Sequence, residues 1–259
     1  MDFITVETQG RVTTITLNRP EVMNAINPPM HAELQAAFDA FAADAGQHLC
    51  VVTGAGDRAF CAGSDLKALA AGAGSDPYPR SGYAGLIDRF DLDKPVIAAV
   101  NGVALGGGFE IVLACDIVVA AQTASFGLPE PLVGAIAVGG GLHRLPRQIG
   151  LKAAMGMVLT SRRVSAEEGA RLGFVNEVAP AGALEATVKR WCDQILLGSP
   201  MALRASKEAI NRGLAEPDLR EAIRRQGEHP AYIAWRDGPD AREGPRAFAE
   251  KREPNWRSR

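Results

Sequence analysis

The fold class of this chain is indicated most clearly by residues 96–120, VIAAVNGVALGGGFEIVLACDIVVA. Residues 96–100 form a short apolar run typical of a buried strand, and the glycine-rich residues 102–108 predict a turn after it. A helix is expected over residues 109–114 and a further strand over residues 117–120. Strands that alternate with helices in this way predict an α/β core whose strands pair in parallel.

The N-terminal part of the chain adds a hairpin, a helix and a strand to this core. Residues 3–8 and 12–17 are rich in β-branched side chains and flank Gln9-Gly10, so they predict a hairpin. Apolar residues recur at helical spacing between residues 28 and 43, and residues 49–53 predict a short buried strand.

A less regular segment follows before the central strands. Asp65 is placed to cap a helix that runs to about residue 71. Residues 71–85, AGAGSDPYPRSGYAG, are the most loop-like part of the chain. Because the composition is the same on both sides, we expect a mobile flap within one domain rather than a linker.

The C-terminal part of the chain has no strand pattern. Residues 182–197, 200–214 and 217–228 are expected to be helices that carry Arg and Lys on their polar faces. The predicted organisation is an α/β core over residues 1–197 and a helical C-terminal region over residues 198–259.

Composition and charge exclude several classes of protein. The chain has 259 residues, of which 47% are hydrophobic, so it can bury a large core without disulfides or metal ions. Its 28 Lys and Arg against 30 Asp and Glu give a net charge of −2, which argues against a nucleic-acid-binding protein. The apolar residues 95–121 are interrupted by glycines, Asn101, Glu110 and Asp116, which argues against a membrane span.

The cysteines indicate a reducing compartment. They show no CxxC or Cys/His ligand spacing, which leaves zinc and redox motifs without support. Their apolar neighbours predict thiols in the core, and the N-terminal MDFITVETQG lacks the pattern of a signal peptide, so we expect a cytoplasmic protein. The four are Cys50, Cys61, Cys115 and Cys192.

Two glutamates stand out as candidate acid/base residues. Glu110 follows Gly107 by three positions, so it lies on the first turn of the predicted helix, whose free backbone N–H groups can stabilise an oxyanion. The plainer interpretation is that a Glu at this position only favours the helix dipole. Glu130 lies in the apolar SFGLPEPLV, where burial would raise its pKa, unless it is an exposed loop residue between two prolines.

Together, the two carboxylates and the glycine-rich turns suggest proton transfer beside a carbonyl group. A dinucleotide-binding site at GAGDRA, residues 54–59, is a weaker alternative, because that motif requires a helix to begin there at once. Spacing alone does not identify the substrate.

Several ordered motifs resemble one known family. These stretches are RPEVMNAI (19–26), AFCAGSDLK (59–67), KPVIAAVNGVALGGGFE (94–110), CDI (115–117), FGLPE (126–130), RLPR (144–147) and AFAEKR (247–252). In order and spacing, from residue 3 to about residue 256, they are similar to the crotonase superfamily, the enoyl-CoA hydratases and isomerases. The resemblance implies an α/β crotonase-type spiral of ββα repeats with a C-terminal helical trimerisation region.

The resemblance also implies a ligand and its chemistry. An acyl-CoA thioester would be the substrate, with no metal or other cofactor, in a homo-trimer or hexamer. By position, the backbone N–H groups of Ser64 and Gly107 would form the oxyanion hole for the thioester oxygen. Glu110 and Glu130 align with the two glutamates of the hydratases, of which one activates water and the other exchanges a proton at the α-carbon.

The CoA moiety has its own positions in this resemblance. Ala25, Ala62 and Lys67 match residues that line the nucleotide site. Phe248 and Lys251 match C-terminal residues that reach CoA from the same or a neighbouring subunit. The plainer interpretation of both lysines is a solvated surface side chain.

Retention of both acids favours an enoyl-CoA hydratase, which adds water to trans-2-enoyl-CoA and forms the 3-hydroxyacyl-CoA. The alternatives are a Δ3,Δ2-enoyl-CoA isomerase, a specialised acyl-CoA dehydratase or a non-catalytic CoA-thioester-binding protein. One departure concerns the segment after the second glutamate, where Val138 replaces a glycine of the family pattern close to the expected water site. Pro131, directly after Glu130, is a second departure and is expected to fix the angle of that carboxylate.

Overall fold

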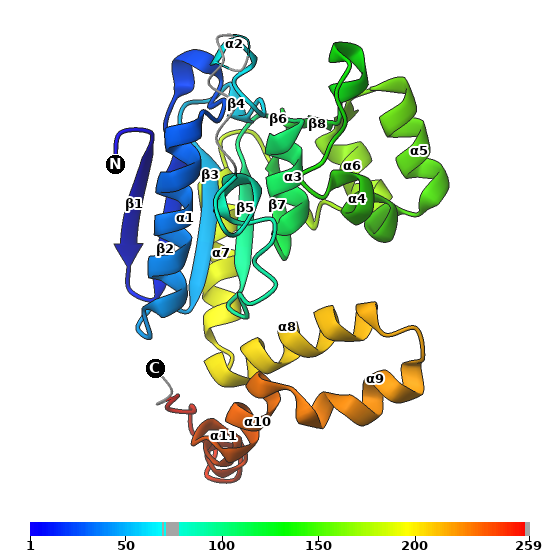
Figure 1. Ribbon diagram of the computed structural model, residues 1–259. Coiled ribbons are helices and arrows are strands. Elements are labelled where there is room, and N and C mark those ends of the chain that lie inside the picture. The colour runs from blue at the N-terminus through cyan, green and yellow to red at the C-terminus, as the bar shows by residue number, and fades with distance from the viewer. Residues whose placement is uncertain (69, 71–77, 257–259) are drawn as a thin grey trace.

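Two sheets form the centre of the computed structural model, which describes residues 1–68, 70 and 78–256 (Figure 1). The larger sheet has the strand order β1-β2-β3-β5-β7-β10, and the smaller has the order β4-β6-β8-β9. The strands of the larger sheet are β1 (Ile4–Gln9), β2 (Val12–Leu17), β3 (Leu49–Gly54), β5 (Val96–Val100), β7 (Ile117–Ala121) and β10 (Glu177–Ala179). Those of the smaller sheet are β4 (Ala59–Cys61), β6 (Val103–Leu105), β8 (Ser125–Gly127) and β9 (Val164–Ser165).

The chain builds these sheets as a spiral. Successive strand pairs β3/β4, β5/β6 and β7/β8 each contribute one strand to the larger sheet and one to the smaller. From β2 to β10 the larger sheet is parallel, as predicted, and β1 pairs with β2 as the predicted antiparallel hairpin. This repeated ββα path confirms the expected crotonase-type architecture.

Helices cover both faces of the larger sheet, which explains why its inner strands β3, β5 and β7 are apolar along most of their length. On one face lies α1 (Pro28–Ala43), which coincides with the predicted helix and is capped by Asn27 Oδ1, 3.0 Å from the Met30 nitrogen. On the other face lies α7 (Leu184–Leu196), packed on β5 and β7. Alternate residues of β3 therefore face opposite cores: Cys50 and Val52 belong to one, Leu49 and Val51 to the other.

The remaining helices form two groups that are well separated in Figure 1. The helices α4 (Gly141–Ile149), α5 (Leu151–Thr160) and α6 (Ala166–Leu172) lie between β8 and β10 in the chain. The predicted helical C-terminal region contains α8 (Pro200–Ala215), α9 (Leu219–Arg225), α10 (Pro230–Asp237) and α11 (Asp240–Ala249). None of the described helices combines the length and the apolar character that a membrane crossing requires.

One local prediction is wrong in part, and one weaker alternative loses its support. The glycine-rich residues 102–108 are not one turn, because Val103–Leu105 pairs as a strand with both β4 and β8, and only Gly106, at φ 54°, makes the turn into α3 (Gly107–Ala114). After Gly54 the chain enters strand β4 instead of a helix, which removes the basis of the dinucleotide alternative.

The predicted flap is packed against α1 where it is described. Of the helix expected over residues 65–71, α2 covers Leu66–Ala68. Residue 69 and residues 71–77 lie outside the described residues. Ser81, Tyr83 and Ala84 are buried, and the nitrogens of Ser81 and Ala84 donate to Gln35 Oε1 and His31 Nδ1, each over 2.9 Å. These hydrogen bonds fix the described end of the segment to the core.

The contact of α3 with β4 gives a test of this fold. A Cβ on Gly108 would overlap the carbonyl group of Cys61, whereas a Cβ on Gly156 in α5 would meet no atom within 4 Å. We expect Gly108→Ala to lower the free energy of unfolding by about 1–3 kcal/mol. Gly156→Ala, the control, should raise it by about 0.5–1 kcal/mol, because alanine is the better helix former. Equal unfolding midpoints in denaturant for the two variants would contradict this packing.

Candidate active site

The N-terminus of α3 carries the first candidate acid. Helix α3 follows β6 through Gly106, and its first residue is Gly107. The Glu110 nitrogen donates to the Gly106 oxygen over 3.0 Å, so the side chain leaves the first turn of the helix. Glu110 is only 3% exposed, which takes its carboxylate out of bulk water.

A glycine-rich segment surrounds the Glu110 carboxylate. The Gly141 nitrogen donates to Glu110 Oε1 over 2.8 Å, and the Gly139 N–H is a second donor. A Cβ on Gly139 would overlap Glu110 Oε2, and one on Gly141 would lie 3.0 Å from Oε1. A side chain at either position would displace the Glu110 carboxylate, so glycine allows the backbone to approach it this closely.

The pKa of Glu110 reflects two opposing influences. Burial raises it to about 7, and the charge of Glu130 adds to the rise. The N–H groups of Gly141 and Gly139 and the charge of Arg144 act in the opposite direction. A carboxyl group with such a pKa can both accept and donate a proton near neutral pH.

Glu130 lies at the other side of the α3 N-terminus. It begins a short 3-10 helix, η4 (Glu130–Val133), in which Pro131 restricts the backbone of the first turn. Its Oε1 would be 3.2 Å from a Cβ on Gly106, and its buried Oε2 has no hydrogen-bond partner among the described residues. Glu130 is half-buried, and burial raises its pKa, which favours a desolvated carboxylate over the exposed-loop alternative.

The segment containing Ser64 runs beside the same helix end. Ser64 forms a parallel bridge with Ile26, and a Cβ on Gly63 would lie 3.2 Å from the Gly107 nitrogen. The backbone of Gly63-Ser64 and the first N–H group of α3 are therefore neighbours. The structure brings Ser64, Gly107, Glu110 and Glu130 together around one helix end.

Two nearby side chains were not identified from the sequence. Tyr83 lies in the segment predicted as a flap, yet it is buried and its hydroxyl oxygen is 3.2 Å from Ser64 Oγ. Arg144 appeared only within a family motif, but its Nη2 donates to the Ile87 oxygen over 2.6 Å and its charge acts on Glu110. Only its helical spacing from Gly141 could have suggested Arg144 from the sequence. No sequence pattern marks Tyr83.

The residues expected at the CoA moiety fall into two groups. Ala25 and Ala62 lie on adjacent segments, since the Ala62 nitrogen donates to the Met23 oxygen over 3.0 Å, and Lys67 is exposed on α2. Phe248, which is 87% exposed, and Lys251 lie at the end of α11, far from α2 in Figure 1. One chain therefore does not bring the two groups together.

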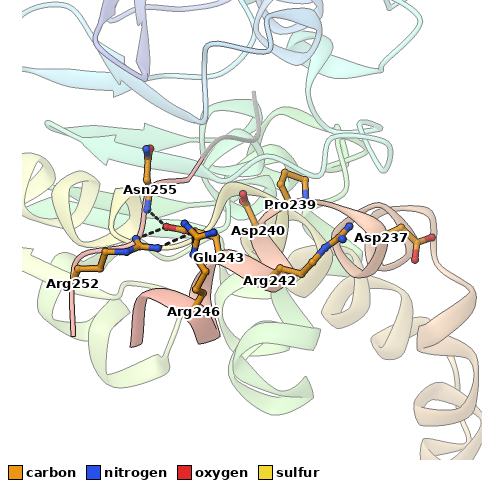
Figure 2. Close-up of a pocket in the computed structure, with 8 residues that line it drawn as sticks. All are labelled: Asp237, Pro239, Asp240, Arg242, Glu243, Arg246, Arg252 and Asn255. Carbon is orange, nitrogen blue, oxygen red and sulfur yellow. Dashed lines mark hydrogen bonds and ion pairs between the residues drawn. The ribbon is translucent and has the colours of Figure 1, made fainter. Parts of the chain in front are cut away.

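A cavity of about 500 Å³ lies at the C-terminal end of the chain (Figure 2), and neither Glu110 nor Glu130 lines it. Its charged groups largely neutralise one another: Glu243 binds Arg252 through Oε1 at 2.6 Å and through Oε2 at 3.1 Å. It is lined by Asp237, Pro239, Asp240, Arg242, Glu243, Arg246, Arg252 and Asn255. None of these is a predicted site residue.

Comparison with known proteins identifies the family. The model of the enoyl-CoA hydratase/isomerase family matches residues 7–259. A carnitinyl-CoA dehydratase of Proteus mirabilis is 42% identical over 255 residues, which is 97% of each chain. One from Salmonella enteritidis is 43% identical over 253 residues, or 96% of each chain. The chain belongs to the enoyl-CoA hydratase/isomerase family, that is, to the crotonase superfamily of enzymes.

Solved structures agree with this assignment. The crystal structure of an enoyl-CoA hydratase from Mycobacterium tuberculosis superposes with a TM-score of 0.91 at 37% identity and covers 98% of both chains. That of a carnitinyl-CoA hydratase from Mycobacterium avium has a TM-score of 0.78 at 39% identity and covers both chains completely. The fold predicted from the sequence motifs is confirmed.

The raised pKa of Glu110 predicts a pH dependence of stability. Because burial disfavours the charged form, the folded state binds this proton more tightly than the unfolded chain, whose Glu pKa is near 4.5. The contribution of Glu110 to stability therefore falls as the pH rises from about 4.5 to about 7. Glu110→Gln should raise the thermal unfolding midpoint more at pH 8 than at pH 5.

The matched control is Glu7→Gln on the exposed face of β1, which should shift the midpoint equally at both pH values. An equal effect of Glu110→Gln at pH 5 and pH 8 would contradict the burial of an ionisable Glu110.

Proposed function

We propose that the protein is an enoyl-CoA hydratase, which adds water reversibly to trans-2-enoyl-CoA and forms 3-hydroxyacyl-CoA. The observation that carries this proposal is the pair of desolvated carboxylates, the buried Glu110 and the half-buried Glu130, each with a raised pKa, on either side of the α3 N-terminus. Hydration requires one group that removes a proton from water and another that delivers a proton to carbon.

We assign the oxyanion hole to the backbone N–H groups of Ser64 and Gly107. The Gly107 N–H belongs to the first turn of α3 and has no acceptor within the helix, and the helix dipole favours negative charge at this end. The thioester oxygen would lie against both N–H groups and gain enolate charge as water attacks. The neighbouring positions of Gly63 and Gly107 support this assignment.

We assign water activation to Glu110 and proton exchange at C2 to Glu130. Glu110 removes a proton from water while the water oxygen bonds to C3, and the electron pair of the C2–C3 double bond moves into the thioester enolate. C2 then takes a proton from Glu130, and the thioester carbonyl re-forms. Two glycine N–H groups hold the Glu110 carboxylate, whereas Glu130 has its Oε1 near Gly106 at the same helix end and its Oε2 without a partner among the described residues, which supports this division of roles.

Hydration is not a net oxidation or reduction, so the proposal includes no redox cofactor, and it assigns every step to the carboxylates and backbone N–H groups without a metal ion. Val138, which replaces a glycine of the family pattern, is 64% exposed and directly precedes Gly139. Its side chain thus does not fill the space at Glu110 in the single chain, which supports hydration over loss of the water site.

A dehydratase of a specialised 3-hydroxyacyl-CoA is the second candidate. The relatives at 42–43% identity are named carnitinyl-CoA dehydratase, and dehydration is the same two-acid reaction in reverse. Carnitinyl-CoA and crotonyl-CoA tested side by side distinguish this candidate from a general hydratase.

The direct test is the loss of the enoyl-thioester absorbance of crotonyl-CoA. We expect turnover by the wild type, and a fall in kcat of about 10²–10⁴-fold in Glu110→Gln and in Glu130→Gln. The control Glu7→Gln should keep the wild-type rate. No turnover, with CoA-ester binding intact, would favour the isomerase or the specialised dehydratase, and tight binding with no reaction of any acyl-CoA would favour the non-catalytic alternative.

We further propose that the chain assembles as a homo-trimer or hexamer through its C-terminal helices, and that Phe248 and Lys251 reach the CoA of a neighbouring subunit. Large apolar side chains on these helices are exposed in the single chain, which supports an interface. They include Ile210, Leu214, Leu219 and Ile223.

The assembly can be measured by light scattering. We expect a mass of three or six chains, and we expect Leu214→Glu to dissociate the assembly and to raise the KM for acyl-CoA. A fully active monomer would contradict the proposal.

A further inference from the structure

The hydroxyl group of Tyr83 has no role in the mechanism above, yet it lies beside the proposed oxyanion hole. Tyr83 begins the short 3-10 helix η3 (Tyr83–Gly85) and is only 3% exposed. Its ring packs edge-on against His31, with the ring centres 4.7 Å apart. His31 Nδ1 in turn accepts a hydrogen bond from the Ala84 nitrogen, so the backbone and the ring of this segment are both fixed to α1.

The phenol oxygen contacts both residues of the proposed oxyanion hole. A Cβ on Gly107 would overlap the hydroxyl oxygen and the Cζ atom of Tyr83, so the end of the ring lies directly on the Gly107 backbone. Ser64 Oγ donates a hydrogen bond to the same oxygen over 3.2 Å. The hydroxyl is therefore adjacent to Ser64 and Gly107 at once.

The Tyr83 hydroxyl carries a proton that no described residue accepts. A phenol accepts hydrogen bonds and also donates one. The oxygen of Tyr83 accepts from Ser64, and no acceptor for its own proton is found among the described residues. Burial holds the pKa of Tyr83 well above its usual value, so the group keeps this proton at neutral pH.

We propose that the Tyr83 hydroxyl is a third hydrogen-bond donor to the thioester oxygen, and that Ser64 Oγ holds it in orientation. This inference rests on the proposed function, because it requires a thioester in the hole formed by Ser64 and Gly107. The donor acts most strongly when the oxygen carries enolate charge, since hydrogen bonds to charged groups are the stronger ones. Tyr83 would thus contribute to catalysis more than to ground-state binding.

The variant Tyr83→Phe removes only the hydroxyl and keeps the ring against His31 and Gly107. We expect kcat/KM for crotonyl-CoA to fall about 10- to 100-fold, as for loss of one hydrogen bond to a charged group. The dissociation constant of butyryl-CoA, which cannot react, should change less than threefold. Tyr78→Phe is the matched control, because it removes a hydroxyl from the same ring cluster, with ring centres 5.5 Å from Tyr83, and should leave both values unchanged.

A spectroscopic measurement distinguishes a donor from a packing residue. We expect the Glu110→Gln/Glu130→Gln double variant to bind crotonyl-CoA without hydrating it, and the infrared frequency of the thioester carbonyl reports hydrogen bonding to the oxygen. We expect adding Tyr83→Phe to move this band toward the frequency of free crotonyl-CoA, and adding Tyr78→Phe to leave it in place. Ser64→Ala removes the side chain that orients the Tyr83 hydroxyl, so it should give an intermediate shift of the carbonyl band. This variant replaces Tyr83→Phe in the test if Tyr83→Phe does not fold.

The outcomes separate this inference from the proposed function. An unchanged carbonyl band and near-wild-type kcat/KM in Tyr83→Phe would overturn the role of Tyr83 while leaving the hydratase intact. If the wild type binds crotonyl-CoA but does not hydrate it, the hydratase proposal fails and the carbonyl band still decides the role of Tyr83. If no acyl-CoA binds, both proposals are overturned.

Discussion

The site depends on one close contact, in which the N-terminus of α3 packs against the backbone at the end of β4. Gly108 leaves no room for a side chain against the Cys61 carbonyl, and Gly63 lies against Gly107 and Leu105 in the same way. A helix end has free N–H groups, and bare backbone lets another segment or a ligand approach them. This contact aligns Ser64 with Gly107 and fixes the direction in which Glu110 leaves the helix. It also explains why the glycines of this region, rather than its side chains, determine its shape.

Around that helix end, burial raises the pKa of both carboxylates, and backbone hydrogen bonds act against that rise. Burial alone would keep Glu110 protonated, and hydrogen bonds alone would keep it ionised. The structure combines the two, and the result is a pKa of about 7. Glu130 is desolvated in a different way: Pro131 fixes its backbone, and one carboxylate oxygen is buried without a partner. Two acids in unlike surroundings can take unlike roles in one proton-transfer reaction.

The sequence predicts much of this arrangement, because its strongest signals are local. The helix that begins at Pro28, the strand at Val96 and the position of Glu110 on α3 follow from periodicity and glycine placement. Strand β6 was predicted as a turn, since three residues between glycines carry too short a pattern to show pairing on both edges. Tyr83 was missed for another reason: its importance comes from packing against Gly107, which is 24 positions away. The roles assigned to Ser64, Lys67, Phe248 and Lys251 come from family resemblance and stay predictions.

The proposed mechanism requires Glu110 to be a buried carboxyl group that exchanges its proton near neutral pH. Difference infrared spectroscopy of the unliganded protein between pH 5 and pH 9, with Glu110→Gln as the reference, measures this group directly. We expect a protonated carboxyl band that disappears with a midpoint at a pH of about 7 and is absent from the variant. A Glu110 that is already fully ionised at pH 5 would overturn this role of Glu110.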